Sequence, residues 1–235
     1  MYYFLTSLRF IILWIIGLVI SAVLSVVSTG IILPLLARFL VSTPWVPVST
    51  EGQLMFYVAL VVIGSGFILG MLIGGMQRWL LQMKFGGEFR WWVIVSILGA
   101  MLGVAGSVII GLQLKDSASL YITEVTHLVK VRPPDIRTWA LSNTLIFSLP
   151  IIGMSLLQTL VLRLYTRAAW LWVLAHIVSA VVFFTLLYTL VVSGAVFIFV
   201  GWLGVLITLA APGIITGFTM LFLLLLIRTP WWPEE

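Results

Sequence analysis

The chain has no cysteine and very little charge. The absence of cysteine excludes disulfides, thiolate metal sites, cysteine-ligated iron–sulfur clusters and thiol catalysis. Only 8% of its residues are charged, against roughly 25% in an ordinary soluble domain. The stretch from Ala168 to Ile227 holds no Asp, Glu, Lys or Arg, and its single histidine is His176. Such a composition is typical of helices in a hydrocarbon bilayer, where a spanning helix needs roughly 20 mostly apolar residues.

Apolar runs along the chain predict an all-α, polytopic transmembrane helical bundle. Hydrophobic residues make up 63% of the 235 residues. No Pro/Ser-rich or charged linker divides them, so residues 1–235 are expected to form a single transmembrane domain. Six spans fit best, and we expect them at about 10–36, 54–81, 91–113, 138–163, 168–191 and 195–228.

The first and last runs need separate treatment. The run that begins at Phe10 is longer than the apolar region of a secretory signal, so it is expected to remain as the first span. The last run is too long for one straight crossing at 1.5 Å per residue. Pro212 lies inside it and removes a backbone hydrogen bond. We expect one kinked helix there, because the repeat described below needs one; two short helices, giving seven spans, are the alternative.

The distribution of basic residues predicts the orientation. With six spans both termini share one side, and that side also holds more Lys and Arg than the other. Its basic residues are Arg9, Arg78, Lys84, Arg90, Arg163, Arg167 and Arg228; those of the opposite side are Arg38, Lys115, Lys130, Arg132 and Arg137. The positive-inside rule then predicts cytoplasmic termini in a bacterial inner (plasma) membrane. The net charge of +5 therefore reflects topology rather than nucleic-acid or nucleotide binding.

The sequence offers no constellation for catalysis. No Asp, Glu, Lys or Arg falls in the middle of an expected span, where proton relays and ion-coupled carriers often need one. No His/Asp/Glu grouping suits a metal ion, so no protein metal site is expected. The one acid–base pair is Glu124 with His127, in an outer loop at 114–137 that is expected to include a short strand or hairpin. We therefore expect a protein that is not an enzyme.

Two segments can be laid over one another without gaps. At an offset of 81 residues Gln77 falls on Gln158, and Trp91 falls on Trp172. A third copy would run through Thr216 and Gly217 near the C-terminus, with Trp14 at the start of the chain closing a circular arrangement. Each unit would be a pair of antiparallel helices, giving three pseudo-repeated hairpins. Chance alignment is the alternative, because few identities support the repeat.

The same residues resemble a loose group of uncharacterised bacterial multi-span membrane proteins. Their recurring signature is a glycine-containing helix that ends Gln-x-x-x-Leu-Arg, then a short loop, then a Trp that begins the next helix. Gln158–Arg163 with Trp172 matches this signature, whereas the copy at Gln77 has Gln82 in place of the arginine. The likeness covers about half of the chain. It implies a helical membrane protein and no particular activity.

Three polar residues at membrane depth are candidates for cofactor binding. His176 could ligate the magnesium of a chlorin or a haem iron through a neutral imidazole nitrogen. Gln77 and Gln158 could donate hydrogen bonds to a quinone, pigment or lipid carbonyl. The other interpretation is structural: each side chain bonds to a neighbouring helix, as polar groups in hydrocarbon commonly do. The cofactor is unknown on this evidence, with chlorin, carotenoid and quinone all open.

Glycines and basic residues carry two further expectations. The small-xxx-small patterns predict close helix packing, or a flat surface for a ring, at Gly66, Gly70, Gly74, Gly99 and Gly103. The basic residues near the cytoplasmic boundary could bind anionic lipid headgroups or could simply set the topology; they are Arg78, Lys84, Arg90, Arg163 and Arg167.

Three classes of function remain. The first is a non-catalytic accessory subunit of a larger membrane complex of photosynthetic or respiratory type, which scaffolds the complex and holds pigment, quinone or lipid. The second is a passive channel or carrier for a neutral or hydrophobic solute, for which Asn143, Gln158 and scattered Ser/Thr would line a path. The third is a lipid-modifying enzyme. The first is favoured, so other membrane subunits and the lipid bilayer are the expected partners.

Overall fold

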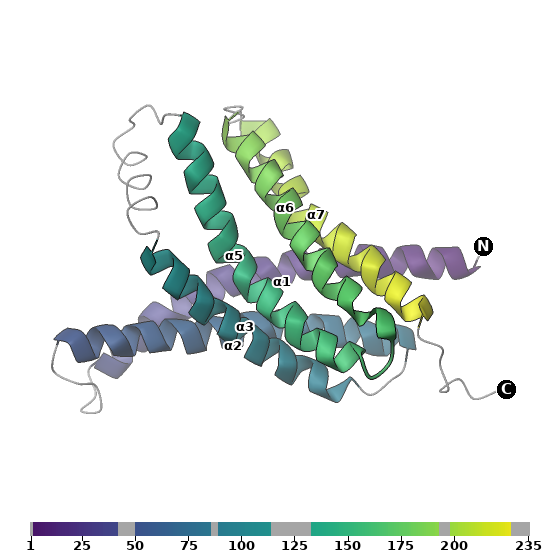
Figure 1. Cartoon of the computed structure of the whole chain (residues 1–235), viewed down its shortest axis with the longest axis horizontal. Helices are drawn as coiled ribbons and strands as arrows, with labels where there is room; N and C mark the ends of the chain where they lie inside the picture. The colour runs from purple at the N-terminus through teal and green to yellow at the C-terminus, as the bar shows by residue number, and fades with distance from the viewer. Residues whose placement is uncertain (1, 42–49, 86–88, 114–132, 193–197, 227–235) are drawn as a thin grey trace.

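The computed structural model describes residues 2–41, 50–85, 89–113, 133–192 and 198–226, and these are helical except for Phe89 and the turn at 163–166. Six long helices and one short 3-10 turn occur in this part of the chain (Figure 1). Their bounds are α1 Tyr2–Val41, α2 Thr50–Phe85, α3 Arg90–Gln113, α5 Pro133–Leu162, η1 Arg167–Ala169, α6 Trp170–Val192 and α7 Ile198–Leu226. Each of the six segments expected from hydropathy is thus a helix. The expected strand or hairpin before Pro133 lies outside the described residues.

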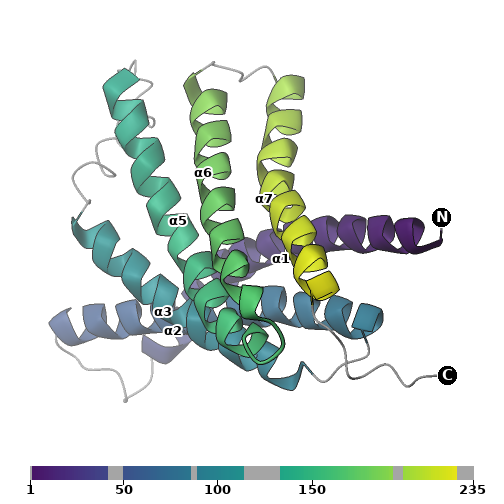
Figure 2. The same ribbon diagram turned by 45° about the vertical axis from the view of Figure 1, so that its right-hand side comes forward.

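The helices form a closed ring in chain order. Each helix contacts the next one along the chain, and α7 closes the ring by packing against α1. Figures 1 and 2 show the end of α2, the start of α3, the turn between α5 and α6, and the end of α7 gathered at one end of the molecule. From there α1 and α2 run along the long axis, whereas α5, α6 and α7 rise away from it. The structure is therefore a splayed bundle that converges at one end.

In the part of the chain that the structure describes, four helices are long and apolar enough to cross a membrane. The segments are Ser7–Ile31, Trp91–Gly111, Thr144–Leu162 and Arg167–Leu186, and a shorter apolar helix runs from Ala210 to Leu226. A helical, membrane-compatible chain is thus confirmed. Crossing by all six helices stays a prediction.

The last apolar run forms one helix rather than two. α7 continues from Ile198 to Leu226 with Pro212 inside it. The hydroxyl of Thr216 donates to the Pro212 carbonyl at 2.8 Å, one turn earlier. The same i−4 bond joins the hydroxyls of Ser96 and Ser179 to the carbonyls of Trp92 and Ala175. Such bonds satisfy a hydroxyl donor within its own helix, which a bilayer interior requires.

Glycines let α3 approach both of its neighbours closely. On α2, a Cβ at Gly66 would lie 2.5 Å from Met101 Cα, and one at Gly70 would collide with the Ile97 backbone. On α3, a Cβ at Gly103 would collide with the backbone of Pro150 on α5. Gly74 and Gly99 make equally tight approaches, to Ser96 and to Gly153 respectively. All five glycines of the two patterns therefore pack helices of this same chain.

We predict that Gly70→Ala destabilises the protein whereas Gly75→Ala, five positions along the same helix, does not. The new methyl at position 70 would overlap backbone, which cannot move as a side chain can. Overpacking of this kind typically costs about 1–3 kcal/mol. A Cβ at Gly75 meets nothing within 4 Å, and alanine has the higher helix propensity. Unfolding in mixed micelles measures both, and equal stability of the two variants would contradict the packing described.

Candidate functional site

Three tryptophans from three different helices form the centre of the convergent end. Trp14 of α1, Trp92 of α3 and Trp172 of α6 are each completely buried. The ring centroids of Trp14 and Trp172 lie 6.0 Å apart at 82°, and those of Trp92 and Trp172 lie 6.3 Å apart. These separations are within the range in which aromatic rings attract one another. The cluster therefore joins helices from the beginning, middle and later part of the chain.

Two of these indoles donate to the glutamines singled out from the sequence. Trp92 Nε1 donates to Gln77 Oε1 at 3.1 Å, which links α3 to α2. Trp172 Nε1 donates to Gln158 Oε1 at 2.8 Å, which links α6 to α5. Both glutamine side chains are completely buried. Since a buried indole N–H needs an acceptor, each glutamine serves as the acceptor that the facing helix supplies.

The third indole, that of Trp14, bonds to a threonine, whose side chain is shorter than that of glutamine. Trp14 Nε1 donates to Thr216 Oγ1 at 3.3 Å, which links the first helix to the last. Thr216 is itself 1% exposed. The relation of indole to acceptor thus occurs three times, in the helix pairs α2–α3, α5–α6 and α7–α1. A duplication of sequence behind this arrangement stays a prediction.

Gln158 connects two of the helix pairs. Its Nε2 donates to Gln77 Oε1 at 2.8 Å and to Ser96 Oγ on α3 at 2.7 Å. Together with the bond from Trp172, these contacts use the carbonyl oxygen and both N–H groups of the amide. Gln158 therefore acts between helices and has no donor left for a quinone or pigment carbonyl.

Gln77 is bonded only through its oxygen. Its Oε1 accepts from Trp92 and from Gln158, whereas its Nε2 is buried and has no partner. Of the two glutamines expected to bind a cofactor carbonyl, only Gln77 keeps a free donor. Thr144 Oγ1 and Arg78 Nε are likewise buried without a partner.

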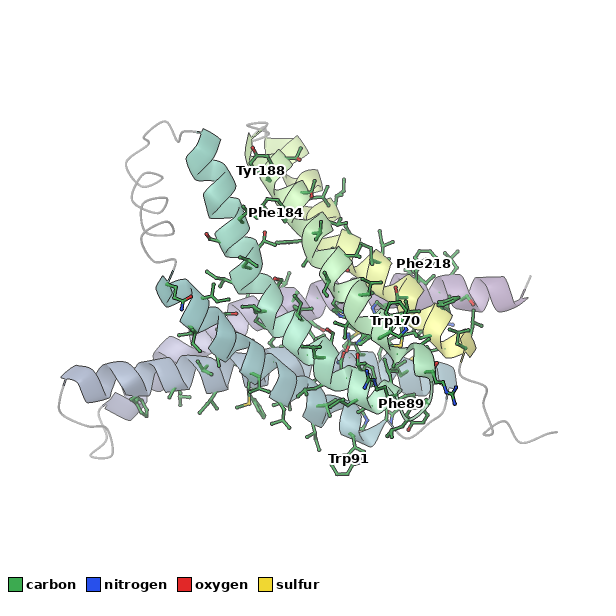
Figure 3. All side chains as sticks on the ribbon, viewed as in Figure 1. Phe89, Trp91, Trp170, Phe184, Tyr188 and Phe218 are labelled. Atoms are coloured by element: carbon green, nitrogen blue, oxygen red, sulfur yellow. The ribbon has the colours of Figure 1, made fainter. Side chains whose placement is uncertain are left out.

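The tryptophan that bonds to Gln77 is not the one that the gapless alignment places over Trp172. Trp91 is 56% exposed and points away from the bundle (Figure 3). Trp92 is 0% exposed and is the indole that bonds to Gln77. Successive residues on a helix point about 100° apart, so only one member of such a pair can face the core. The equivalent spacing from glutamine to tryptophan is therefore one residue longer in the first helix pair than in the second.

His176 lies one turn after Trp172 on α6 and is 3% exposed. Its Nδ1 is 2.8 Å from the Trp172 carbonyl, and its ring stands edge-on to that indole with centroids 4.4 Å apart. Because a carbonyl can only accept, Nδ1 carries the proton and the lone pair of the neutral ring is on Nε2. The histidine thus belongs to the tryptophan cluster. Ligation of a pigment through Nε2 stays a prediction.

The basic residues expected near headgroups lie close to the ends of helices at the convergent end. Arg163 and Arg167 flank the turn between α5 and α6 and are exposed, and Arg78 is half-buried on α2. Lys84 is near the end of α2, and Arg90 is the first residue of α3. Five basic residues therefore lie toward the end of the bundle that holds the tryptophan cluster.

Other candidate residues do not join this site. Glu124 and His127 lie outside the described residues, and so the acid–base pair cannot be located. Among the described residues no group of three or more His, Cys, Asp or Glu could hold a metal ion. Sequence reasoning missed Ser96, whose only signal is its position one helical turn after Trp92. No protein-family model, curated protein or solved structure matches this chain.

We predict that Gln158→Met destabilises the protein by about 1–3 kcal/mol for each buried donor left unpaired. Methionine has nearly the shape of glutamine but offers no strong acceptor to Trp172 and no donor to Ser96. Gln82→Met is the matched control, because Gln82 is exposed on α2. Unfolding in mixed micelles gives both values. A Gln158→Met variant as stable as the control would show that the hydrogen bonds at Gln158 do not hold the helix pairs together.

Proposed function

We propose that this chain is a non-catalytic membrane subunit that scaffolds a larger complex of photosynthetic or respiratory type. It would lie in the bacterial inner (plasma) membrane with both termini in the cytoplasm. The bundle would be three pseudo-repeated hairpins, α2–α3, α5–α6 and α7–α1, each closed by an indole bonded to the facing helix. Six membrane spans complete this proposal.

The observation that carries the proposal is the use made of the polar side chains. Gln158 directs its whole amide to Trp172, Gln77 and Ser96, so it holds helices together and lines no path for a solute. A passive channel or carrier would instead present such groups along an open route. The core therefore favours a rigid support over a conduit.

The exposed faces of the helices support the same role. On α1 large apolar side chains recur every three or four residues on one exposed stripe: Ile12, Ile16, Ile20, Leu24, Val27 and Ile31. α3 carries a similar stripe at Ile94, Leu98, Leu102 and Ile109. Such surfaces suit the acyl chains of lipids and the apolar helices of neighbouring subunits.

The basic end supports attachment to the cytoplasmic leaflet. Arg163 and Arg167 are exposed beside Trp170, which is itself 55% exposed. Basic and tryptophan side chains together are typical of the boundary between hydrocarbon and headgroups. We propose that Arg78, Lys84, Arg90, Arg163 and Arg167 contact anionic lipid headgroups there, where each cation contributes about 1 kcal/mol of attraction.

Native mass spectrometry of the protein, released from its own membranes in a mild detergent, tests the scaffold role. We predict that it leaves the membrane with other subunits, and that a chlorin, carotenoid or quinone accompanies them if His176 is a ligand. The control is the same chain expressed alone in a heterologous membrane. Release from its own membranes as a bare 26.1 kDa chain, together with solute-induced swelling of proteoliposomes, would replace the scaffold by the passive channel.

A further inference from the structure

Among the residues that the structure describes, the amide nitrogen of Gln77 is the one donor of the tryptophan and glutamine side chains just named that has no partner. The side chain is 0% exposed, and Nε2 has no partner. Exchanging the oxygen and nitrogen would not help, because the oxygen accepts from two donors, Trp92 Nε1 and Gln158 Nε2. The network therefore fixes the orientation of the amide. Buried amide donors are nearly always paired, so this one requires an explanation.

Gln158 is the corresponding glutamine of the helix pair α5–α6, and both N–H groups of its amide are bonded. Its Nε2 donates to the glutamine of the preceding helix pair, Gln77, and to Ser96, which lies four residues after the tryptophan of that pair. One step around the ring, the pair that precedes α2–α3 is α7–α1. Its acceptor residue is Thr216, and the residue four positions after its tryptophan, Trp14, is Leu18. Gln77 and Ser96 accept hydrogen bonds from Gln158 Nε2, whereas neither Thr216 nor Leu18 accepts one from Gln77 Nε2.

The described contacts put this stretch of α1 beside α2. A Cβ at Gly17 would lie 2.8 Å from the Met76 side chain, directly before Gln77. One turn after Leu18, Ser21 Oγ donates to the Leu72 carbonyl of α2 at 3.4 Å. Leu18 therefore lies along the α1–α2 contact and presents no hydrogen-bonding atom to it.

Thr216 is already engaged. Its oxygen accepts from Trp14 Nε1, and its hydroxyl hydrogen donates to the Pro212 carbonyl. Threonine is also two heavy atoms shorter along the side chain than glutamine, so it carries no amide oxygen toward Gln77. Gln77 Nε2 is thus a buried donor without an acceptor among the described residues. The bonding of Gln158 indicates where that acceptor would lie, on the side of Gln77 that corresponds to Thr216 and Leu18, and we call this position the corner of the core.

We propose that this corner binds a compact, uncharged oxygen acceptor that takes the hydrogen bond from Gln77 Nε2. The acceptor is either a single internal water or the carbonyl oxygen of a lipid or quinone molecule; the chemistry is the same in both cases. An uncharged acceptor is the one proposed, because the donor is an uncharged amide on a side chain that is 0% exposed, and an anion buried there would lose its hydration. The site stands independently of the scaffold role, since it is argued from the hydrogen bonds of Gln77 and Gln158 within this chain.

The test introduces a glutamine at position 216, which supplies the amide oxygen that threonine lacks. If the glutamine in Thr216→Gln repeats the bonding of Gln158, its oxygen accepts from Trp14 and takes the place of the missing acceptor of Gln77. Thr216→Met is the matched control, because it has the same length and no strong acceptor. Each protein is labelled with 15N-glutamine in lipid nanodiscs, and the side-chain amide of Gln77 is followed by NMR. Thermal midpoints and extracted small molecules are measured in parallel.

In the wild-type protein we expect the Gln77 amide to show a cross-peak either to water or to a co-purified carbonyl compound, and the partner observed identifies the source. Thr216→Gln should abolish that cross-peak, shift the amide resonance and raise the thermal midpoint above that of Thr216→Met. A Gln77 amide without a cross-peak in the wild type, or a resonance unchanged in both variants, would overturn the proposal.

A second pair of variants keeps the test decisive if Thr216→Gln does not fold. Leu18→Ser offers a hydroxyl at the position that corresponds to Ser96, and Leu18→Ala removes the same bulk without a hydroxyl. The proposal expects the wild-type cross-peak to be lost in Leu18→Ser and kept in Leu18→Ala. Identical spectra for the two variants would overturn it. Partner subunits play no part in these measurements, so the scaffold role and the corner site can fail separately.

Discussion

An indole N–H buried away from water has to find an acceptor, and this requirement organises the convergent end of the bundle. Trp14, Trp92 and Trp172 are all completely buried, and each obtains its acceptor from the facing helix. In hydrocarbon the alternative is an unpaired donor, which water would otherwise satisfy. Gln158 also donates to the neighbouring pair, through Gln77 and Ser96. Gln77 and Thr216 donate to no further helix pair among the described residues.

Close packing of the helices brings these groups within hydrogen-bond distance. Gln158 reaches Ser96 across the contact between α3 and α5, and that contact is narrow because Gly99 and Gly103 carry no Cβ. Away from this end no equivalent polar network is described, and the helices diverge (Figure 1). The helices are therefore joined by hydrogen bonds at the convergent end and expose apolar surfaces beyond it. This arrangement suits a subunit that neighbouring membrane proteins and lipids pack against.

Much of this arrangement is predictable from the sequence, and the exceptions have physical reasons. Hydropathy predicts the positions of all six helices, because bilayer and core helices need the same uninterrupted apolar runs. The recurrence of Gln77 and Gln158 before a tryptophan indicated the core residues. The burial of Trp92 rather than Trp91 is not predictable from the fixed offset of 81 residues, because neighbouring residues on a helix point about 100° apart. The role of Ser96 was not foreseen either, because a serine in a helix usually bonds only to its own backbone.

A double-mutant cycle between Trp172 and Gln158 tests the central claim most directly. Trp172→Phe removes the indole N–H but keeps an aromatic ring, and Gln158→Leu removes the acceptor. If the 2.8 Å bond between them holds α5 to α6, the two free-energy changes should be non-additive by about 0.5–3 kcal/mol. Changes that simply add, within about 0.5 kcal/mol, would mean that the pair is not coupled and that the convergent end is held by packing alone.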